Sequence, residues 1–296
     1  MSAHSKGKSL GTITGLVAAE IRKDSNGYRS SGPQSNDDNG CSESTNLVPD
    51  RIYIKDRLKA ADMLIPGSRL GLNTPDEYRR IKRPLLSNAF GKTASLVDRG
   101  NLMLVTSSVP GEGKTYTAIN LALSIARERD HTVLLVDCDV AKQGASKMLG
   151  LEGMPGLVDV LESEDMTVGD VLLRTDVEEL TLLSAGKQHE YVTELLASQR
   201  MSTLVDEMIS RYEDRIIVFD GPPLLPTPQT NVLAEMVGQV VFVIGAGQTP
   251  EVIVDEALEM LPENLAIGLI LNKTEGMQGH GGYYYGYYGS ADDKKK

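Results

Sequence analysis

A glycine-rich stretch at residues 107–115, SSVPGEGKT, has the residue types and spacing that bind phosphate groups. Its last eight residues fit the P-loop pattern GxxxxGK[ST], except that Ser108 stands in place of the first glycine. Gly111 and Gly113 allow the backbone to curl and bring successive N–H groups close to phosphate oxygens. The alternative is a plain glycine-rich turn between a strand and a helix. The strand–loop–helix context favours a nucleotide-binding loop.

Two side chains at the end of this loop have uses in nucleotide chemistry. Lys114 can reach the terminal phosphates of a nucleotide, and the Thr115 hydroxyl can ligate Mg²⁺. The positive end of the helix that begins near Lys114 points at the same place. Tyr116, the next residue, is expected to pack within that helix rather than to be phosphorylated.

Three aspartates are predicted to lie at strand ends near this loop. VLLVDCD places Asp137 and Asp139 just past one apolar run, and RIIVFDGPP places Asp220 at the end of another. The carboxyl ends of parallel strands are where an open α/β sheet builds its site. Mg²⁺ prefers oxygen ligands, so Asp139 or Asp220 would hold the metal, and Asp137 is free to accept a proton from an incoming hydroxyl. A single aspartate at a strand end is more often a turn former or a helix cap, but three beside a P-loop favour a metal site.

The elements that must position these residues begin near Asn101. Short, continuously apolar runs alternate with longer helical stretches, which is typical of strands buried on both faces. We therefore predict an α/β fold of the P-loop NTPase class, a mostly parallel sheet with helices on both faces. The predicted strands are NLMLVTS, TVLLVD, LTLLSAG, RIIVFD, QVVFVIGAG and AIGLILNK, and the clearest helices are KTYTAINLALSIARER, TNVLAEMV and PEVIVDEALEML.

The remaining chain divides by composition. Residues 24–50 contain almost nothing to bury, whereas two stretches between them and the P-loop look helical, the second with Pro84 expected to kink or interrupt it. The predicted divisions are 1–50, mostly disordered with an optional short helix at 9–23; 51–98, a helical arm with helices at 56–66 and 74–90; 99–275, the P-loop domain; and 276–296, a disordered tail rich in glycine and tyrosine.

Composition and charge exclude several classes of protein. The chain of 296 residues is 41% hydrophobic and carries a net charge of −11, which argues against a nucleic-acid partner. No apolar run approaches the roughly 18 residues of a membrane span, and no export signal is visible. Cys41 and Cys138 are too few for a disulfide framework or a structural zinc site, and Cys138 is expected in the core. We expect a cytoplasmic protein, and recruitment to the inner face of the cell membrane stays an open alternative.

The tail crowds tyrosines into GGYYYGYYGS, although the chain has no tryptophan and only three phenylalanines. One interpretation is a sticky low-complexity end. The other is that the hydroxyls are a substrate, presented on flexible glycine spacers to one active site. The tyrosines concerned are Tyr283, Tyr284, Tyr285, Tyr287 and Tyr288.

These features together resemble the bacterial tyrosine kinases, P-loop enzymes unrelated to eukaryotic kinases. LLVDCD matches the second acidic motif of that family and IIVFDGPP the third, while Glu77, Arg80 and Arg83 spell its subunit-contact motif ExxRxxR. The tyrosine cluster follows in the family's order, so that the resemblance covers about residues 74–288. EYRRIKRPLL, DCDVAK and the Gly/Tyr tail are more narrowly similar to the tyrosine autokinases encoded with exosortase-type exopolysaccharide systems.

The resemblance implies roles for these residues, with ATP and Mg²⁺ as cofactors. Asp137 would activate the tyrosine hydroxyl, and Thr115, Asp139 and Asp220 would position the metal. The nucleotide contacts would be Ser108, Val109, Pro110, Gly111, Glu112, Gly113, Lys114, Thr115 and Tyr116, with Asn272 as an adenine contact, since related P-loop ATPases touch the base near this point.

Partners are implied in the same way. Glu77, Arg80 and Arg83 would join subunits in a ring, so that one tail enters the next active site, although a solvated charged stripe is the alternative. A separate membrane protein that sets polysaccharide chain length and a phosphotyrosine phosphatase are the other expected partners. One departure is Ala141, which stands where the family has an arginine.

Two other functions stay open at this point. A cell-division or plasmid-partition ATPase shares the fold, but such proteins carry an early P-loop lysine where this chain has Val109. A nucleotide-gated scaffold would bind ATP without producing phosphotyrosine.

Overall fold

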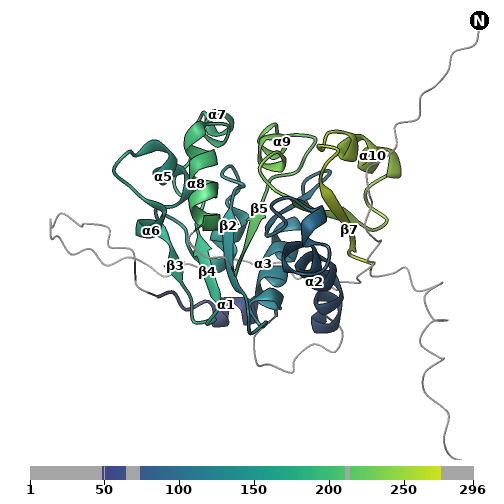
Figure 1. Cartoon of the computed structure of the whole chain (residues 1–296), viewed down its shortest axis with the longest axis horizontal. Coiled ribbons are helices and arrows are strands. Elements are labelled where there is room, and N and C mark those ends of the chain that lie inside the picture. Colours follow the sequence, from purple (N-terminus) through teal and green to yellow (C-terminus); the bar gives the residue numbers. More distant parts are fainter. Residues whose placement is uncertain (1–48, 50, 65–73, 211–213, 275–296) are drawn as a thin grey trace, which may run out of the picture.

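Seven strands form one sheet in the order β3-β4-β2-β5-β1-β6-β7 (Figure 1). The computed structural model describes residues 49, 51–64, 74–210 and 214–274. Every neighbouring pair is parallel except β3 and β4. The predicted α/β class and its mostly parallel sheet are therefore confirmed, and the antiparallel β3 is a strand that the sequence analysis missed. The strands are β1 Leu102–Ser107, β2 Thr132–Asp137, β3 Leu173–Arg174, β4 Leu180–Leu183, β5 Arg215–Asp220, β6 Gln239–Gly245 and β7 Ala266–Asn272.

Helices cover both faces of the sheet, because successive side chains of each central strand point to opposite sides. On β1, Met103 and Val105 pack into one hydrophobic cluster, while Leu102 and Leu104 pack into another. The first cluster includes α1 Lys55–Ala60, α2 Thr74–Phe90, α3 Lys114–Ile125 and α4 Gly144–Leu149. The second includes α5 Leu157–Glu162, α6 Val168–Val171, α7 Val192–Leu196, α8 Gln199–Ser210, α9 Gln229–Ala234 and α10 Glu251–Glu259.

The helix predicted over residues 56–66 is shorter in the structure. α1 ends at Ala60, and Asp62 takes a left-handed φ of 51°. The N–H of Met63 then donates to the carbonyl of Leu58 at 2.9 Å, which closes the helix end. Leu64 continues onto α3, where its N–H donates to the Asn120 side chain at 2.8 Å.

α2 runs without a break through Pro84, so the expected interruption at that residue is wrong. Proline removes one main-chain hydrogen bond from the helix, and tertiary contacts on the next turn compensate for that loss. Leu85 is buried, and its carbonyl accepts a hydrogen bond from Gln239 at 3.0 Å. Gln239 in turn accepts one from Asn88 at 3.0 Å. These contacts hold the C-terminal half of α2 against β6.

No helix among the residues shown in colour in Figure 1 is long and apolar enough to cross a membrane. The segment predicted at 9–23 and the tyrosine tail both lie outside the described residues.

Candidate active site

The glycine-rich loop leaves β1 at Ser107 and enters α3 at Lys114. Gly111 and Gly113 have φ values of +91° and +101°, a region that suits glycine, and the chain curls there as predicted. The main-chain N–H groups of residues 111–115 donate no hydrogen bond of ordinary geometry within the part of the chain that the structure describes. Consecutive free N–H groups at a helix start form an anion-binding concavity, so this loop fits a nucleotide's phosphates.

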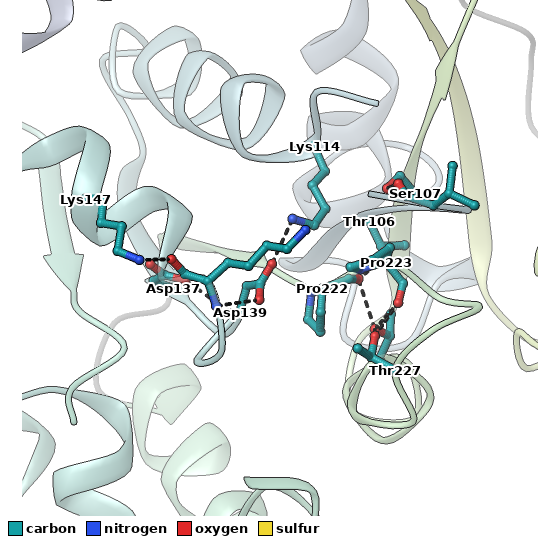
Figure 2. A network of polar contacts seen from close by, with 12 residues as sticks. Thr106, Ser107, Lys114, Asp137, Asp139, Lys147, Pro222, Pro223 and Thr227 are labelled. Atoms are coloured by element: carbon teal, nitrogen blue, oxygen red, sulfur yellow. Dashed lines mark hydrogen bonds and ion pairs between the residues drawn. The ribbon is translucent and has the colours of Figure 1, made fainter. Parts of the chain in front are cut away.

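Lys114 points from the first turn of α3 toward Asp139, as Figure 2 shows. Its Nζ lies 2.9 Å from Asp139 Oδ2, and the two side chains are 10% and 3% exposed. Loss of either partner of such a buried ion pair would destabilise the fold, because the remaining buried charge would be unpaired. The lysine is therefore positioned at the strand ends and not in open solvent.

Asp137 lies at the end of β2, beside Asp220 at the end of β5, because the two residues are register partners. Asp137 Oδ2 accepts a hydrogen bond from the Ser146 N–H at 2.7 Å, and Oδ1 accepts one from the Asp139 N–H at 3.2 Å. Burial raises the pKa of Asp137, although the bonds from Ser146 act in the opposite direction. A carboxylate with a raised pKa is a better proton acceptor than an exposed one.

Asp220 is fully buried, and neither carboxylate oxygen accepts a hydrogen bond of ordinary geometry among the described residues. Burial raises the pKa of its carboxyl to about 8, and Asp137 adds to the rise while Lys114 and Thr115 oppose it. Buried oxygens with no donor of ordinary hydrogen-bond geometry fit a divalent cation, which would supply the missing positive charge.

The donor set around this position also fits Mg²⁺. Within the described residues, no three His, Cys, Asp or Glu side chains form a complete metal-binding group. Mg²⁺ usually takes one or two carboxylates and completes its shell with waters and substrate phosphates. Asp220 is the buried carboxylate here, and the Thr115 hydroxyl and Asp139 lie close enough to act on its pKa.

Asn272, predicted as an adenine contact, lies against the phosphate loop itself. Its side-chain N–H donates to the Glu112 carbonyl at 2.8 Å, and its side-chain oxygen accepts from the Lys273 N–H at 2.9 Å. A Cβ added to Gly113 would lie 2.0 Å from Asn272 Nδ2. The glycine therefore serves close packing as well as backbone conformation.

Replacing Gly113 with alanine is expected to lower the free energy of unfolding by about 2–4 kcal/mol, since a left-handed alanine costs about 1–2 kcal/mol and the displaced Asn272 loses a buried hydrogen bond. Gly111→Ala is the matched control, because its φ is similar but a Cβ there meets nothing within 4 Å. Urea unfolding of both variants measures the difference. Equal losses of unfolding free energy in the two variants would show that the Asn272 side chain moves aside without loss of stability.

A cavity of about 380 Å³ opens beside Asp139. Its lining is mixed, with the apolar surfaces of Cys138 and Val140 facing polar groups such as His189 and Gln229. Asp139 and Pro222 both line the cavity, which therefore reaches the residues that follow β2 and β5. This space can admit an aromatic side chain that carries a hydroxyl.

Residues 103–247 match the AAA domain family. Tyrosine-protein kinase YwqD of Bacillus subtilis (strain 168) is 30% identical over 220 residues, which cover 74% of this chain and 87% of that protein. The chain belongs to the bacterial tyrosine-protein kinases. The crystal structure of the VpsO kinase domain is 28% identical, with a TM-score of 0.57 over 67% of this chain and 95% of that one. The succinoglycan biosynthesis transport protein ExoP of Rhizobium meliloti (strain 1021) is 28% identical over 75% of this chain, but this match covers only 29% of ExoP.

Family membership confirms the resemblance drawn from the motifs and does not favour a partition-type ATPase. In this tyrosine kinase the structure brings together the loop, Lys114 and the three aspartates. Tyr116 packs away from the loop, where its hydroxyl donates to the Asp62 carbonyl at 2.8 Å. Cys138 is buried as expected, and burial raises the pKa of its thiol well above the usual value.

The predicted subunit-contact residues lie on α2. Arg80 and Arg83 are exposed, and Glu77 is half-buried. Between them, Tyr78 and Ile81 are buried against the kinase core. The five tail tyrosines lie outside the described residues, so their place relative to the site stays a prediction.

Two residues near the site have contacts that the sequence analysis missed. Ser146, on α4, binds Asp137 through its N–H, and its hydroxyl accepts from the Ala185 N–H at 3.1 Å. Glu112 was expected only as a nucleotide contact, but its side chain is 2% exposed and bonded within the protein. No local pattern signals the bonds to Ala185 and Gly245, because these partners lie 39 and 133 residues away along the chain.

Proposed function

We propose that this protein is an ATP-dependent protein-tyrosine autokinase that phosphorylates its own C-terminal tyrosines, Tyr283, Tyr284, Tyr285, Tyr287 and Tyr288. The observation that carries the proposal is the convergence of unoccupied loop N–H groups, Lys114 and three strand-end aspartates. Phosphoryl transfer needs positioning and charge stabilisation more than covalent help from the protein, and this set of groups provides both.

ATP is the phosphoryl donor, and its contacts would come from residues 108–116 and Asn272. When ATP binds, the Lys114 ammonium group would leave Asp139 and contact the phosphate oxygens. Asp139 would then be able to join Asp220 and Thr115 as a metal ligand. When bound, Mg²⁺ supplies neutralisation of the charge on the phosphates.

Asp137 is the proposed proton acceptor. The tyrosine oxygen forms a bond to the terminal phosphorus, the bond to the ADP oxygen breaks, and the phenolic proton passes to Asp137. Each carboxylate oxygen has two acceptor sites, so the bonds from Ser146 and Asp139 leave capacity for the incoming hydroxyl. The cavity beside Asp139 would hold the tyrosine ring.

The subunits are proposed to act on one another. Arg80 and Arg83 are exposed on α2 and Glu77 is half-buried, and this stretch of the helix is the proposed contact with a second copy. In such a ring, a tail from one subunit would enter the site of the next. Each phosphotyrosine adds roughly −1.5 to −2 charges, and several on a protein of net charge −11 would favour dissociation.

The proposed setting is control of exopolysaccharide synthesis or export at the cytoplasmic face of the membrane. Its support is the name of ExoP and the similarity of the motifs to exosortase-linked autokinases. A separate chain-length protein in the membrane and a phosphotyrosine phosphatase are the partners that this setting requires.

The test mixes two full-length variants with Mg²⁺ and ATP and reads phosphate on tail peptides by mass spectrometry. The first carries phenylalanine at all five tail tyrosines and keeps its active site, while the second carries Lys114→Met and keeps its tail. We expect phosphate on the Lys114→Met tail only when the other variant is present, because the donor site and the acceptor then come from different subunits.

Two controls complete the experiment. Wild-type protein alone should acquire tail phosphate, and each variant alone should not. A wild-type tail without phosphate, in a protein that binds ATP, would contradict the autokinase proposal and favour a nucleotide-gated scaffold. Phosphate in the wild type but not in the mixture would mean transfer within one subunit.

A further inference from the structure

Glu112 is an acidic residue inside the phosphate loop, yet its side chain does not face the phosphates. It is 2% exposed, and Oε2 accepts a hydrogen bond from the Val109 N–H at 2.8 Å. Oε1 accepts from the Gly245 N–H at 3.0 Å and from the Thr249 hydroxyl. One carboxylate thus binds the first part of the loop and, 133 residues away, the last residue of β6, together with Thr249 just beyond that strand.

The main chain of the same residue is held from β7, the strand beyond β6 in the sheet. The Glu112 carbonyl accepts the Asn272 side-chain N–H at 2.8 Å, at the end of β7. The loop is therefore fastened to β6 and β7 through a single residue, at the point where its backbone curls between Gly111 and Gly113. Hydrogen bonds to a charged acceptor are the stronger kind, and buried ones also fix geometry.

These contacts decide what Glu112 can do. Three donors occupy its two oxygens, so the carboxylate has little capacity left for a metal or for a proton from substrate. The Val109 N–H is directed to Glu112 and is withdrawn from nucleotide binding, which leaves the N–H groups of residues 111–115 as the cradle. A carboxylate facing the phosphates would repel them, and the three donors direct its charge elsewhere.

We infer that Glu112 is a positioning residue, which sets the shape of the phosphate loop by fastening it to residues 245–249, so that ATP affinity depends on this distant segment. The inference rests on the nucleotide binding that the proposed function requires. It assigns to Glu112 no part in the transfer step.

The experiment measures two quantities, the Kd for Mg²⁺·ATP by calorimetry and kcat for tail phosphorylation at saturating ATP. Glu112→Ala removes all three side-chain bonds and is expected to raise Kd by at least about 10-fold, a larger factor than any fall in kcat. Glu112→Gln keeps one acceptor oxygen but turns an amide N–H toward a donor, and we expect a smaller rise. Glu152→Ala, at an exposed glutamate, is the matched control.

Thr249→Val tests the connection to the β6–α10 segment without changing the loop. Alone it is expected to raise Kd by about threefold, and in the Glu112→Ala background it should add nothing, because the bond is already absent. If Glu112→Ala fails to fold, Glu112→Gln and Thr249→Val carry the test. A Kd within about twofold of wild type for both of those variants, or independent effects in the double variant, would overturn the inference.

A merely structural role would lower the thermal midpoint without changing the Kd of the folded protein, so that outcome also counts against the inference. The result is separable from the proposed function. Absence of phosphotyrosine in the wild type would contradict the kinase proposal, and the Kd comparison would still decide the role of Glu112.

Discussion

Replacing Lys114 with methionine is expected to lower the rate of tail phosphorylation by at least about 100-fold, the usual effect of removing one group that stabilises transition-state charge. Methionine keeps an unbranched side chain of similar length and removes only the ammonium group. In the structure that group lies 2.9 Å from Asp139, at the ends of β2 and β5. The measurement is the initial rate of phosphotyrosine formation with Mg²⁺ and ATP.

Lys147→Met is the matched control for this prediction. Lys147 is an exposed lysine close to the site, and its ammonium group donates to the Lys142 carbonyl at 2.7 Å (Figure 2). We expect its rate to stay within about threefold of wild type, as is usual for a surface substitution. Equal losses in both variants would assign the effect to general surface charge and contradict the role of Lys114.

Loss of folding must be distinguished from loss of chemistry in Lys114→Met. Removing one partner of a buried ion pair leaves Asp139 without its cation, which costs about 3–5 kcal/mol unless the carboxylate takes up a proton. Circular dichroism at the assay temperature shows whether the variant is folded. A folded variant with a wild-type rate would mean that another cation carries the charge in the transition state.

The fold and the local part of the site could be predicted because their signals lie in short stretches of sequence. β1, β2, β5 and β6 are continuously apolar, since each is buried on both faces. The loop and the aspartates follow these strands directly, and the parallel register then places Asp137 beside Asp220. Predicting which segments are strands, and where each strand ends, was therefore enough to predict that these aspartates lie together.

Long-range contacts could not be predicted in the same way. The helix α2 passes through Pro84 because Leu85 and Asn88 are fastened to Gln239, more than 150 residues away. The Glu112 side chain accepts a hydrogen bond from Gly245, and the Glu112 carbonyl accepts one from Asn272, across similar separations in sequence. Such pairs depend on which strands become neighbours, and a sequence pattern within one segment carries no such information.

Asp220→Asn is expected to have effects of opposite sign on stability and activity. The carboxylate is fully buried, accepts no hydrogen bond of ordinary geometry among the described residues, and lies beside Asp137. Its pKa of about 8 reflects how strongly this position disfavours negative charge. Removal of the acid should therefore raise the unfolding free energy of the metal-free protein by about 1–3 kcal/mol.

The same substitution is expected to lower tail phosphorylation by at least about 100-fold, because the proposed role of the Asp220 carboxylate is to hold Mg²⁺. Thermal unfolding in EDTA and initial rates with Mg²⁺ measure the two effects on one sample. Asp214→Asn, at the exposed start of the segment that leads into β5, is the control and should change neither.

The pair of results tests the metal assignment more sharply than activity alone. A variant that loses both stability and activity would mean that Asp220 holds the strand ends together, and its proposed role as a metal ligand would be wrong. A more stable variant that keeps its activity would mean that Asp139 and Thr115 hold the metal without Asp220. The metal-ligand role predicts three results together. The metal-free variant is more stable than the wild type, it loses tail phosphorylation, and it no longer gains the extra stability that Mg²⁺·ATP gives the wild type.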